Sequence, residues 1–149
     1  MIRLTRRYRF AASHRLHTPR LSDEENRELY GKCNNPYGHG HNYAVEISLR
    51  GPVDETTGRA VDLAALDRLV QAVVLDAFDH RNMNIEIPQF RHLVPTSENL
   101  GLEIDRRLRA SWQTEFAGEW PRLDKVRIAE TERNIFEVSE GHETSKSGS

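Results

Sequence analysis

The sequence predicts an α+β fold in which helices cover one face of an antiparallel sheet. Two segments of alternating apolar and polar residues lie near the amino end, two segments with helical periodicity follow, and two more alternating segments come last. This order places hairpins side by side and leaves the helices to pack on the sheet. The 149 residues suffice for one domain with a sizeable core, which we assign to residues 1–140, and the polar residues 141–149 are expected to form a disordered tail.

Strict alternation predicts the first two strands. In residues 2–14 one face is apolar and the other is rich in arginine. The segment from Gly38 to Arg50 also alternates, so its odd-numbered residues share one face. Between the strands, Ser22 is placed to cap a short helical turn over residues 23–29. The shared face of the second strand carries His39, His41, Tyr43, Val45, Ile47 and Leu49.

Two helices are predicted from apolar residues at helical spacing. Asp62 is placed to cap the first helix, whose apolar stripe runs to about Phe78. Thr96 or Ser97 begins the second helix, whose apolar side extends to Trp112.

A closing hairpin is predicted at the carboxyl end. Residues 125–131 and 134–139 alternate, with a turn at 132–134, whereas residues 79–95 between the helices contain two prolines and are expected to form a loop. Four strands with free edges favour a closed barrel between subunits, because closure removes unpaired strand edges.

Composition excludes several classes of protein. A formal net charge of -2 gives no reason to expect a nucleic-acid or membrane partner. The single cysteine, Cys33, rules out an internal disulfide framework and fits a reducing compartment. No apolar stretch is long enough to span a membrane, and the amino end lacks the apolar core of a signal peptide, so we expect a cytoplasmic protein.

Three histidines predict a zinc site. His39 and His41 lie two residues apart at the mouth of an apolar strand face, and His14 has the parity of the apolar face of the first strand. Neutral imidazoles are good zinc ligands, and three of them would leave one coordination position open, as in catalytic zinc sites. On local grounds alone, His39 and His41 are equally compatible with packing as two strand histidines, and a residue such as His14 is more often simply a partly buried histidine.

Cys33 and the pair Asp79 and His80 are candidates for proton transfer. Cys33 lies in a polar turn beside Lys32, and a cationic neighbour and a nearby metal would both lower its pKa and suit it as a base or nucleophile. Asp79 is placed to orient the imidazole of His80 so that it exchanges protons with Cys33. The other interpretations are a small buried cysteine and a histidine at a helix carboxyl end.

Glu130 has the parity of Val126 and Ile128, so it is expected to face the apolar side of its strand. An inward carboxylate needs a partner, either an internal arginine or a ligand with neighbouring N–H donors. Thr96 and Ser97 offer hydroxyl groups at the amino end of the second helix, although a helix cap explains them equally well.

Six segments resemble signature segments of the 6-pyruvoyltetrahydropterin synthase family, in the family's order and over about residues 10–138. They are FAASHRL, LSDEEN, YGKCNNPYGHGHNY, LDAFDHRNMN, PTSENL and AETERNI. The spacing Cys-x5-His-Gly-His resembles that of the pyruvoyl branch of the family. The related 6-carboxytetrahydropterin synthases of queuosine biosynthesis generally have the shorter Cys-x3-His-Gly-His. Ser97 departs from the Thr-Thr-Glu that the family often has at this place.

The resemblance implies the tunnelling fold, in which trimers form a barrel and two trimers stack into a homohexamer. It implies Cys33 as the base that removes a carbon proton, with Asp79 and His80 as a relay pair. It further implies that Glu130 grips the pterin ring, that Thr96, Ser97 and Glu98 lie near the pterin, and that zinc is held by His14, His39 and His41.

The reaction that the resemblance implies belongs to tetrahydrobiopterin biosynthesis. A carbon–oxygen lyase acting on a phosphate ester converts 7,8-dihydroneopterin triphosphate to 6-pyruvoyltetrahydropterin with loss of triphosphate, and no redox cofactor takes part. Three other functions stay open. They are a 6-carboxytetrahydropterin synthase, which breaks a carbon–carbon bond of the same substrate, a non-catalytic zinc-stabilised oligomer, and a cysteine hydrolase, for which no oxyanion-hole signature is visible.

Overall fold

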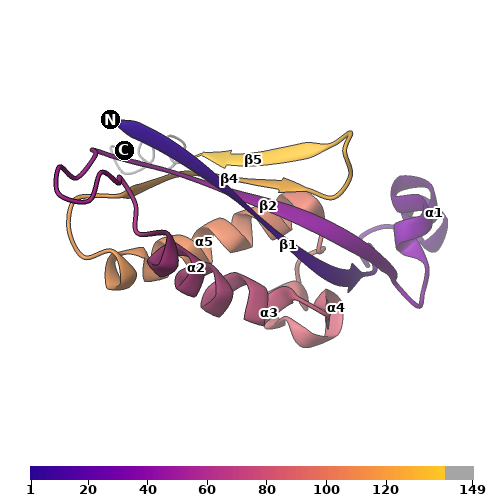
Figure 1. Ribbon diagram of the computed structural model, residues 1–149. Coiled ribbons are helices and arrows are strands. Elements are labelled where there is room, and N and C mark those ends of the chain that lie inside the picture. Colours follow the sequence, from indigo (N-terminus) through magenta and orange to yellow (C-terminus); the bar gives the residue numbers. More distant parts are fainter. Residues whose placement is uncertain (140–149) are drawn as a thin grey trace, which may run out of the picture.

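The computed structural model describes residues 1–139, and the expected tail lies outside them. Five strands form one sheet in the order β3-β1-β2-β4-β5, and helices cover one of its faces (Figure 1). This confirms the predicted α+β class. The strands are β1 (Ile2–His14), β2 (His39–Gly51), β3 (Arg81–Asn82), β4 (Arg122–Ala129) and β5 (Ile135–Ser139).

Helical segments fill the connections between the strands. Those between β1 and β2 are α1 (Asp23–Tyr30) and the 3-10 turn η1 (Gly31–Asn34). The others are α2 (Leu63–Val70), the π segment η2 (Gln71–Leu75), α3 (Asp76–Phe78), α4 (Met83–Glu86), the 3-10 turn η3 (Pro88–Phe90) and α5 (Ser97–Glu115). No helix within residues 1–139 has the length and apolar character needed to cross a membrane.

The long antiparallel β1–β2 hairpin determines which side chains face the helices. Its register pairs Ile2 with Gly51 at one end and His14 with His39 at the other. Inward residues such as Phe10 and Tyr43 are buried and stack with ring centroids 5.2 Å apart, as the alternation predicted. The inward face of the hairpin is therefore apolar and buried along its middle.

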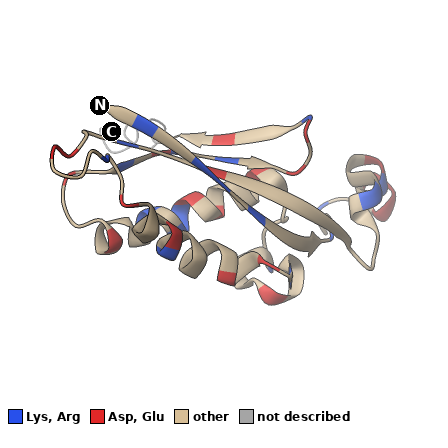
Figure 2. Ribbon diagram, in the orientation of Figure 1, with Lys and Arg blue, Asp and Glu red and all other residues tan. Residues whose placement is uncertain are grey.

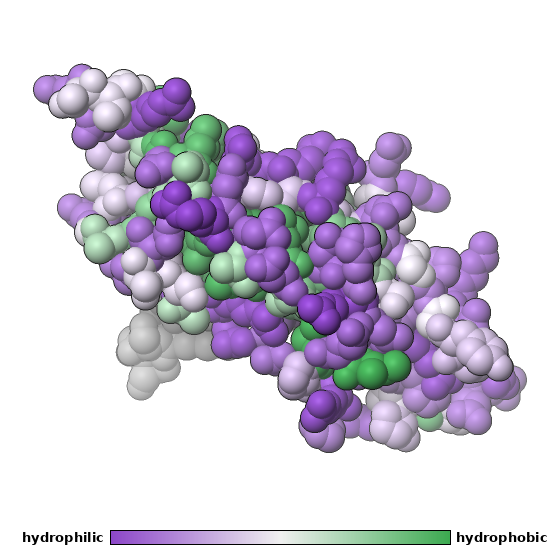
Figure 3. Space-filling view, turned by 60° about the horizontal axis from the view of Figure 1, so that its bottom comes forward, coloured by the Kyte–Doolittle hydropathy of each residue, from purple (hydrophilic) through white to green (hydrophobic). Residues whose placement is uncertain are grey.

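The helices α2, α3 and α5 bury the inward face of the sheet. Val45, Ile47 and Leu49 of β2 are fully buried beneath them. The predicted cap residues are confirmed, since Ser22, Asp62 and Thr96 each accept a backbone N–H at a helix start. Seen from the side of the helices, the surface is mostly hydrophilic and hydrophobic residues show in separate areas (Figure 3).

The connection at residues 79–95 is more ordered than the predicted loop. β3 pairs with β1 in parallel, so the prediction of a purely antiparallel sheet is wrong at this edge. Two residues are too few to show any periodicity, and the following short helix α4 is capped by Asn82. The segment nevertheless holds the edge of β1 that leads into His14.

Candidate metal and active site

The site lies where the β1–β2 hairpin ends beside α1. The hairpin register brings the imidazoles of His14 and His41 together, with their Nε2 atoms 3.0 Å apart. Gly38 allows this close pairing, because its φ is +86° and a Cβ there would lie 3.3 Å from the carbonyl oxygen of His14. Two ring nitrogens from neighbouring strands thus point at one position.

His14 is fully buried and its orientation is fixed. Its Nδ1 lies 2.9 Å from the carbonyl oxygen of Pro95, which can only accept, so Nδ1 carries the proton and Nε2 keeps its lone pair. The hydroxyl group of Tyr43 lies 3.2 Å from the same Nδ1. Burial, followed by the neighbouring His41, lowers the pKa of His14, so the ring is neutral at pH 7, the state that binds a metal.

Glu130 joins the two histidines from the end of β4. Its Oε1 lies 2.8 Å from Nε2 of His41, and its Oε2 accepts a 2.5 Å hydrogen bond from the hydroxyl of Ser97 at the start of α5. Its carboxylate therefore lies on the inward side, as its strand parity predicted, and its partners are a histidine and a serine. Burial lowers the pKa of His41, while Glu130 acts in the opposite direction.

Cys33 approaches the same point from η1. Its Sγ lies 3.7 Å from Nε2 of His41, and its carbonyl oxygen accepts the N–H of Leu16, which ties the turn to the end of β1. Burial and then Glu130 raise the pKa of the thiol. The expectation that Lys32 lowers this pKa is wrong, because its side chain is exposed to water and burial dominates.

These four residues suit a divalent metal ion. Donor atoms of His14, Cys33, His41 and Glu130 all lie within 4.8 Å of one another. Two imidazole nitrogens, a thiol and a carboxylate are the donors that zinc takes in proteins, and the bond from His14 to a backbone carbonyl is the usual support of a metal-binding histidine. The chemistry of the donor set therefore fits the predicted ion.

His39 lies next to this group of four without belonging to it. Its ring centroid is 4.5 Å from that of His41, and the two rings meet edge to face. The structure thus brings together His14 and His41 of the three predicted zinc ligands and leaves the ring of His39 at the rim.

Asp79 and His80 lie at the β3 edge of the sheet. Asp79 accepts the N–H of Ala11 at 2.9 Å, its other oxygen lies 3.5 Å from Nε2 of His80, and 84% of the His80 side chain is exposed. His80 has a φ of 60°, a left-handed conformation that histidine tolerates better than most residues. Within residues 1–139, neither residue forms a hydrogen bond or ion pair with Cys33.

The start of α5 contributes to the site through Ser97 and Pro95. Thr96 caps the helix by accepting the N–H of Asn99 at 3.2 Å, and Glu98 is exposed in the first turn. Sequence reasoning missed that Tyr43 and the Pro95 carbonyl orient His14. The position of Tyr43, two residues after His41 on the same strand face, was the only signal for the first, and a backbone carbonyl gives none.

Comparisons with known proteins agree with this geometry. Residues 3–141 match the family model described as 6-pyruvoyl tetrahydropterin synthase. The 6-pyruvoyl tetrahydrobiopterin synthase of Poecilia reticulata is 44% identical over 132 residues, which are 89% of this chain and 86% of that protein. The human protein of the same name is 40% identical over 89% of this chain and 87% of its own length.

A solved structure is similar over almost the whole chain. The 6-pyruvoyl tetrahydropterin synthase of Caenorhabditis elegans superposes with a TM-score of 0.82 at 42% sequence identity, covering 93% of this chain and 94% of that one. The two proteins are therefore similar both in the arrangement of helices and strands and in amino-acid sequence.

Proposed function

Because this chain belongs to the 6-pyruvoyl tetrahydropterin synthase family, an enzyme family of lyase type, we propose that it converts 7,8-dihydroneopterin triphosphate to 6-pyruvoyltetrahydropterin with release of triphosphate. The observation that carries the proposal is the convergence of His14, Cys33, His41 and Glu130 on one point. A packing role does not account for a thiol, a carboxylate and two oriented imidazoles in the same place. The names of the relatives favour the pyruvoyl branch over the carboxy branch.

Zinc is the proposed metal, held by His14 and His41 with His39 turning in from the rim. When bound, it would supply Lewis-acid chemistry that makes the carbon protons of the substrate side chain easier to remove. His14 is preorganised for binding, since the carbonyl of Pro95 fixes its proton on Nδ1. The lowered pKa values of His14 and His41 keep both rings free to bind at neutral pH.

Cys33 is the proposed base. Its Sγ lies 3.7 Å from His41 Nε2, so a substrate held at the histidines would place its side-chain carbons beside the sulfur. A neutral thiol cannot take up a proton, and its raised pKa shows that the protein's own groups disfavour the thiolate. A divalent cation beside the sulfur would favour that thiolate.

Glu130 is the proposed anchor of the pterin ring. A carboxylate accepts two neighbouring N–H donors side by side, which matches the amino-pyrimidine edge of a pterin. The hydroxyl of Ser97 holds one oxygen of this carboxylate at 2.5 Å, so Ser97 orients the anchor, and we propose that Thr96 and Glu98 line the ring beside it.

Asp79 and His80 are proposed to act in the site of a neighbouring subunit. His80 is exposed at the β3 edge, and within residues 1–139 no strand pairs with β5 on its outer side, at the opposite edge of the sheet. Joining such edges would close three sheets into a barrel, and two stacked trimers would give the proposed homohexamer. The charge pattern favours a small-molecule substrate over a membrane or nucleic-acid partner, and the single cysteine fits the cytoplasm, where we place the enzyme.

Mass spectrometry of the products formed from 7,8-dihydroneopterin triphosphate tests the proposal. The zinc-loaded protein should release triphosphate and form 6-pyruvoyltetrahydropterin without an added redox cofactor. Formation of 6-carboxytetrahydropterin with a two-carbon aldehyde would assign the chain to the carboxy reaction instead. Unchanged substrate, at full zinc content, would favour a zinc-stabilised oligomer without catalysis.

A further inference from the structure

A cationic cavity opens beside the site, between α1, η1 and the start of β2. Its volume is about 500 Å³. Of the described residues that line it, three are cations and one is a carboxylate, so together they carry a positive charge. The lining residues that matter here are Arg15, Asp23, Arg27, Lys32, Asn34 and His39.

Among the residues that the structure describes, the three cations of this cavity have no acidic partner. Within residues 1–139, no carboxylate lies within ion-pair distance of Arg15, Arg27 or Lys32. Every arginine of α5, by contrast, forms an ion pair. Figure 2 shows acidic and basic residues together on α1, and Asp23 is the acidic residue of that helix that lines the cavity. Unpaired cations gathered around a cavity indicate an anionic ligand.

Arg15 is held in place for such a ligand. Its backbone N–H and carbonyl are both bound by the side chain of Asn84, at 2.7 Å and 2.9 Å. Its Nε donates to the carbonyl of Asn34 at 3.1 Å, so the guanidinium is anchored at one nitrogen. The two terminal nitrogens make no other hydrogen bond within the described residues, which leaves them available to phosphate oxygens.

The cavity lies directly beside the group formed by His14, Cys33, His41 and Glu130. Arg15 directly follows His14, and Lys32 directly precedes Cys33. His39 lines the cavity while its ring lies 4.5 Å from that of His41. A ligand that is bound at these four residues and extends past His39 therefore enters the cavity.

We propose that this cavity binds the triphosphate of the substrate through Arg15, Arg27 and Lys32. The inference rests on the proposed function for the identity of the ligand. In that substrate the carbon that carries the triphosphate is bonded to one of the two hydroxyl-bearing carbons of the side chain, so the first phosphate must lie close to His14, Cys33, His41 and Glu130. Arginine and lysine bind phosphate through charge-assisted hydrogen bonds, and an open cavity lets the released triphosphate leave.

Binding of inorganic triphosphate to the zinc-loaded protein, measured by titration calorimetry, tests the cavity directly. Arg27→Gln and Lys32→Gln should each raise its Kd about threefold to tenfold, the size expected for an exposed charged contact, and added salt should weaken binding by the wild type. Asp23→Asn should lower the Kd, because it removes the one carboxylate among the described residues of the lining. All three residues are exposed, so these changes leave the core intact.

Matched controls separate the cavity from general electrostatics. Arg20→Gln and Glu24→Gln make the same charge changes at exposed neighbours outside the lining, and both should leave the Kd for triphosphate unchanged. Zinc content, measured after each titration, shows whether triphosphate has removed the metal. Equal effects of the cavity and control variants would overturn the proposal.

Kinetics distinguish failure of this inference from failure of the proposed function. The cavity variants should raise the KM for 7,8-dihydroneopterin triphosphate and leave the Kd of 7,8-dihydroneopterin, which has no phosphates, unchanged. If the wild type turns over the substrate and the variants keep its KM, the inference fails and the function stands. If triphosphate binds in the cavity of a wild type without turnover, the function fails and the cavity stands.

Discussion

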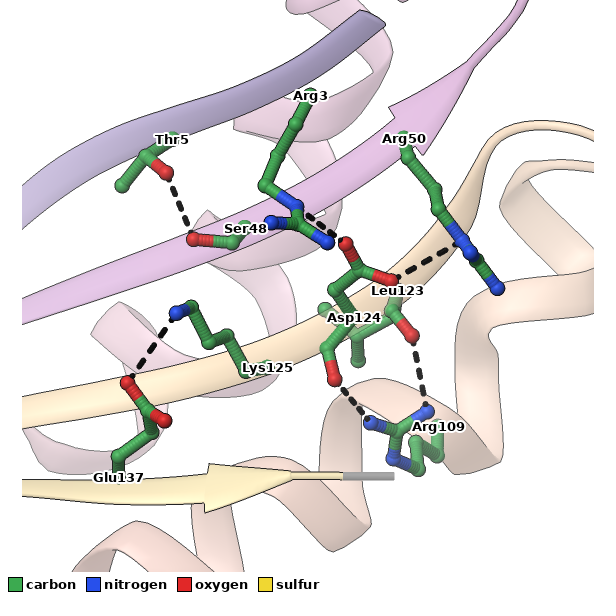
Figure 4. A network of polar contacts seen from close by, with 9 residues as sticks. All are labelled: Arg3, Thr5, Ser48, Arg50, Arg109, Leu123, Asp124, Lys125 and Glu137. Atoms are coloured by element: carbon green, nitrogen blue, oxygen red, sulfur yellow. Dashed lines mark hydrogen bonds and ion pairs between the residues drawn. The ribbon is translucent and has the colours of Figure 1, made fainter. Parts of the chain in front are cut away.

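The two ends of the β1–β2 hairpin treat polar groups in opposite ways. At the end near Ile2, the carboxylate of Asp124 lies 2.7 Å from Arg3 and 3.1 Å from Arg50, while the hydroxyls of Thr5 and Ser48 bond each other at 2.7 Å (Figure 4). At the other end, two imidazole nitrogens lie 3.0 Å apart, with a thiol and a carboxylate beside them. One end pairs opposite charges with each other, and the other gathers side chains that can bind a metal ion.

This difference indicates which end of the hairpin stabilises the fold and which end binds ligands. Paired charges at the Asp124 end stabilise the fold and need nothing from outside. At the His14 end, the lone pair on Nε2 of His14 and the carboxylate of Glu130 are ligand groups that gain free energy when a cation binds between them. Substitutions at the His14 end should therefore change binding and turnover, and those at the Asp124 end should change stability alone.

The largest expected effect is loss of the metal. His14→Ala should reduce zinc from about one ion per subunit to near zero and abolish turnover, because it removes an oriented ligand. His39→Ala should do the same if the rim histidine turns in to bind. Elemental analysis of the purified variants checks this, with His92→Ala, an exposed histidine in the loop before α5, as the matched control. Full zinc content in His39→Ala would mean that Glu130 or Cys33, and not His39, is the third zinc ligand.

Removing the proposed base should have the next largest effect. Cys33→Ala should lower kcat by about 10² to 10⁴-fold, the usual contribution of a general base, while the KM changes little. Zinc content and the unfolding midpoint should stay close to those of the wild type, because only half-buried sulfur is lost. Turnover near the wild-type value would assign Cys33 to packing or to metal binding.

Glu130→Gln is expected to weaken pterin binding without dismantling the site. The amide keeps an oxygen for the hydroxyl of Ser97, but it presents N–H groups where the ring edge also donates. The Kd of 7,8-dihydroneopterin, measured by fluorescence, should rise about tenfold to a hundredfold, which corresponds to about 1.5–3 kcal/mol for hydrogen bonds to a charged group. A normal Kd with reduced zinc content would make Glu130 a metal ligand instead of the pterin anchor.

Sequence periodicity predicted most of the fold and the inward faces that carry His14, His41 and Glu130. Alternation identified the face that His14, His39 and His41 share, and cap residues located both long helices. Local strand geometry could not show that the ring of His39 lies at the rim, since it fixes a face and not a side-chain direction. It also could not place His80 relative to Cys33, because the two lie on segments that only tertiary structure or assembly brings together.

The start of β4 shows how a bulge hides a strand from such analysis. The prediction began this strand at Lys125, whereas it begins at Arg122. Between Ser48 and Leu49 of β2 the register shifts, so Asp124 is the extra residue opposite them. Alternation is broken there, because two partly exposed residues separate the buried Leu123 and Val126. The same bulge makes Asp124 available to the two arginines.

Asp124→Asn tests the stabilising end of the hairpin and should have the smallest effect on function. The Asp124 side chain is 13% exposed, and Nε of Arg50 is buried beside it without a hydrogen bond, so within residues 1–139 the carboxylate is the one ion-pair partner of Arg50. An amide oxygen can serve one arginine and leaves the other facing an N–H group. The free energy of unfolding should fall by about 1–3 kcal/mol in urea titrations, with kcat and zinc content unchanged.

Arg3→Gln is the matched variant for this prediction. The Arg3 side chain is 61% exposed, so water replaces much of the lost contact and the cost should stay below about 1 kcal/mol. A larger loss for Asp124→Asn than for Arg3→Gln would identify the buried Arg50 contact as the stabilising one. Equal losses would mean that Arg50 is compensated by water, and a fall in kcat for Asp124→Asn at unchanged stability would contradict the division of the hairpin into a structural and a chemical end. The comparison holds because both variants remove one charge from the same ion-pair network, and they differ in whether the partner left behind can reach solvent.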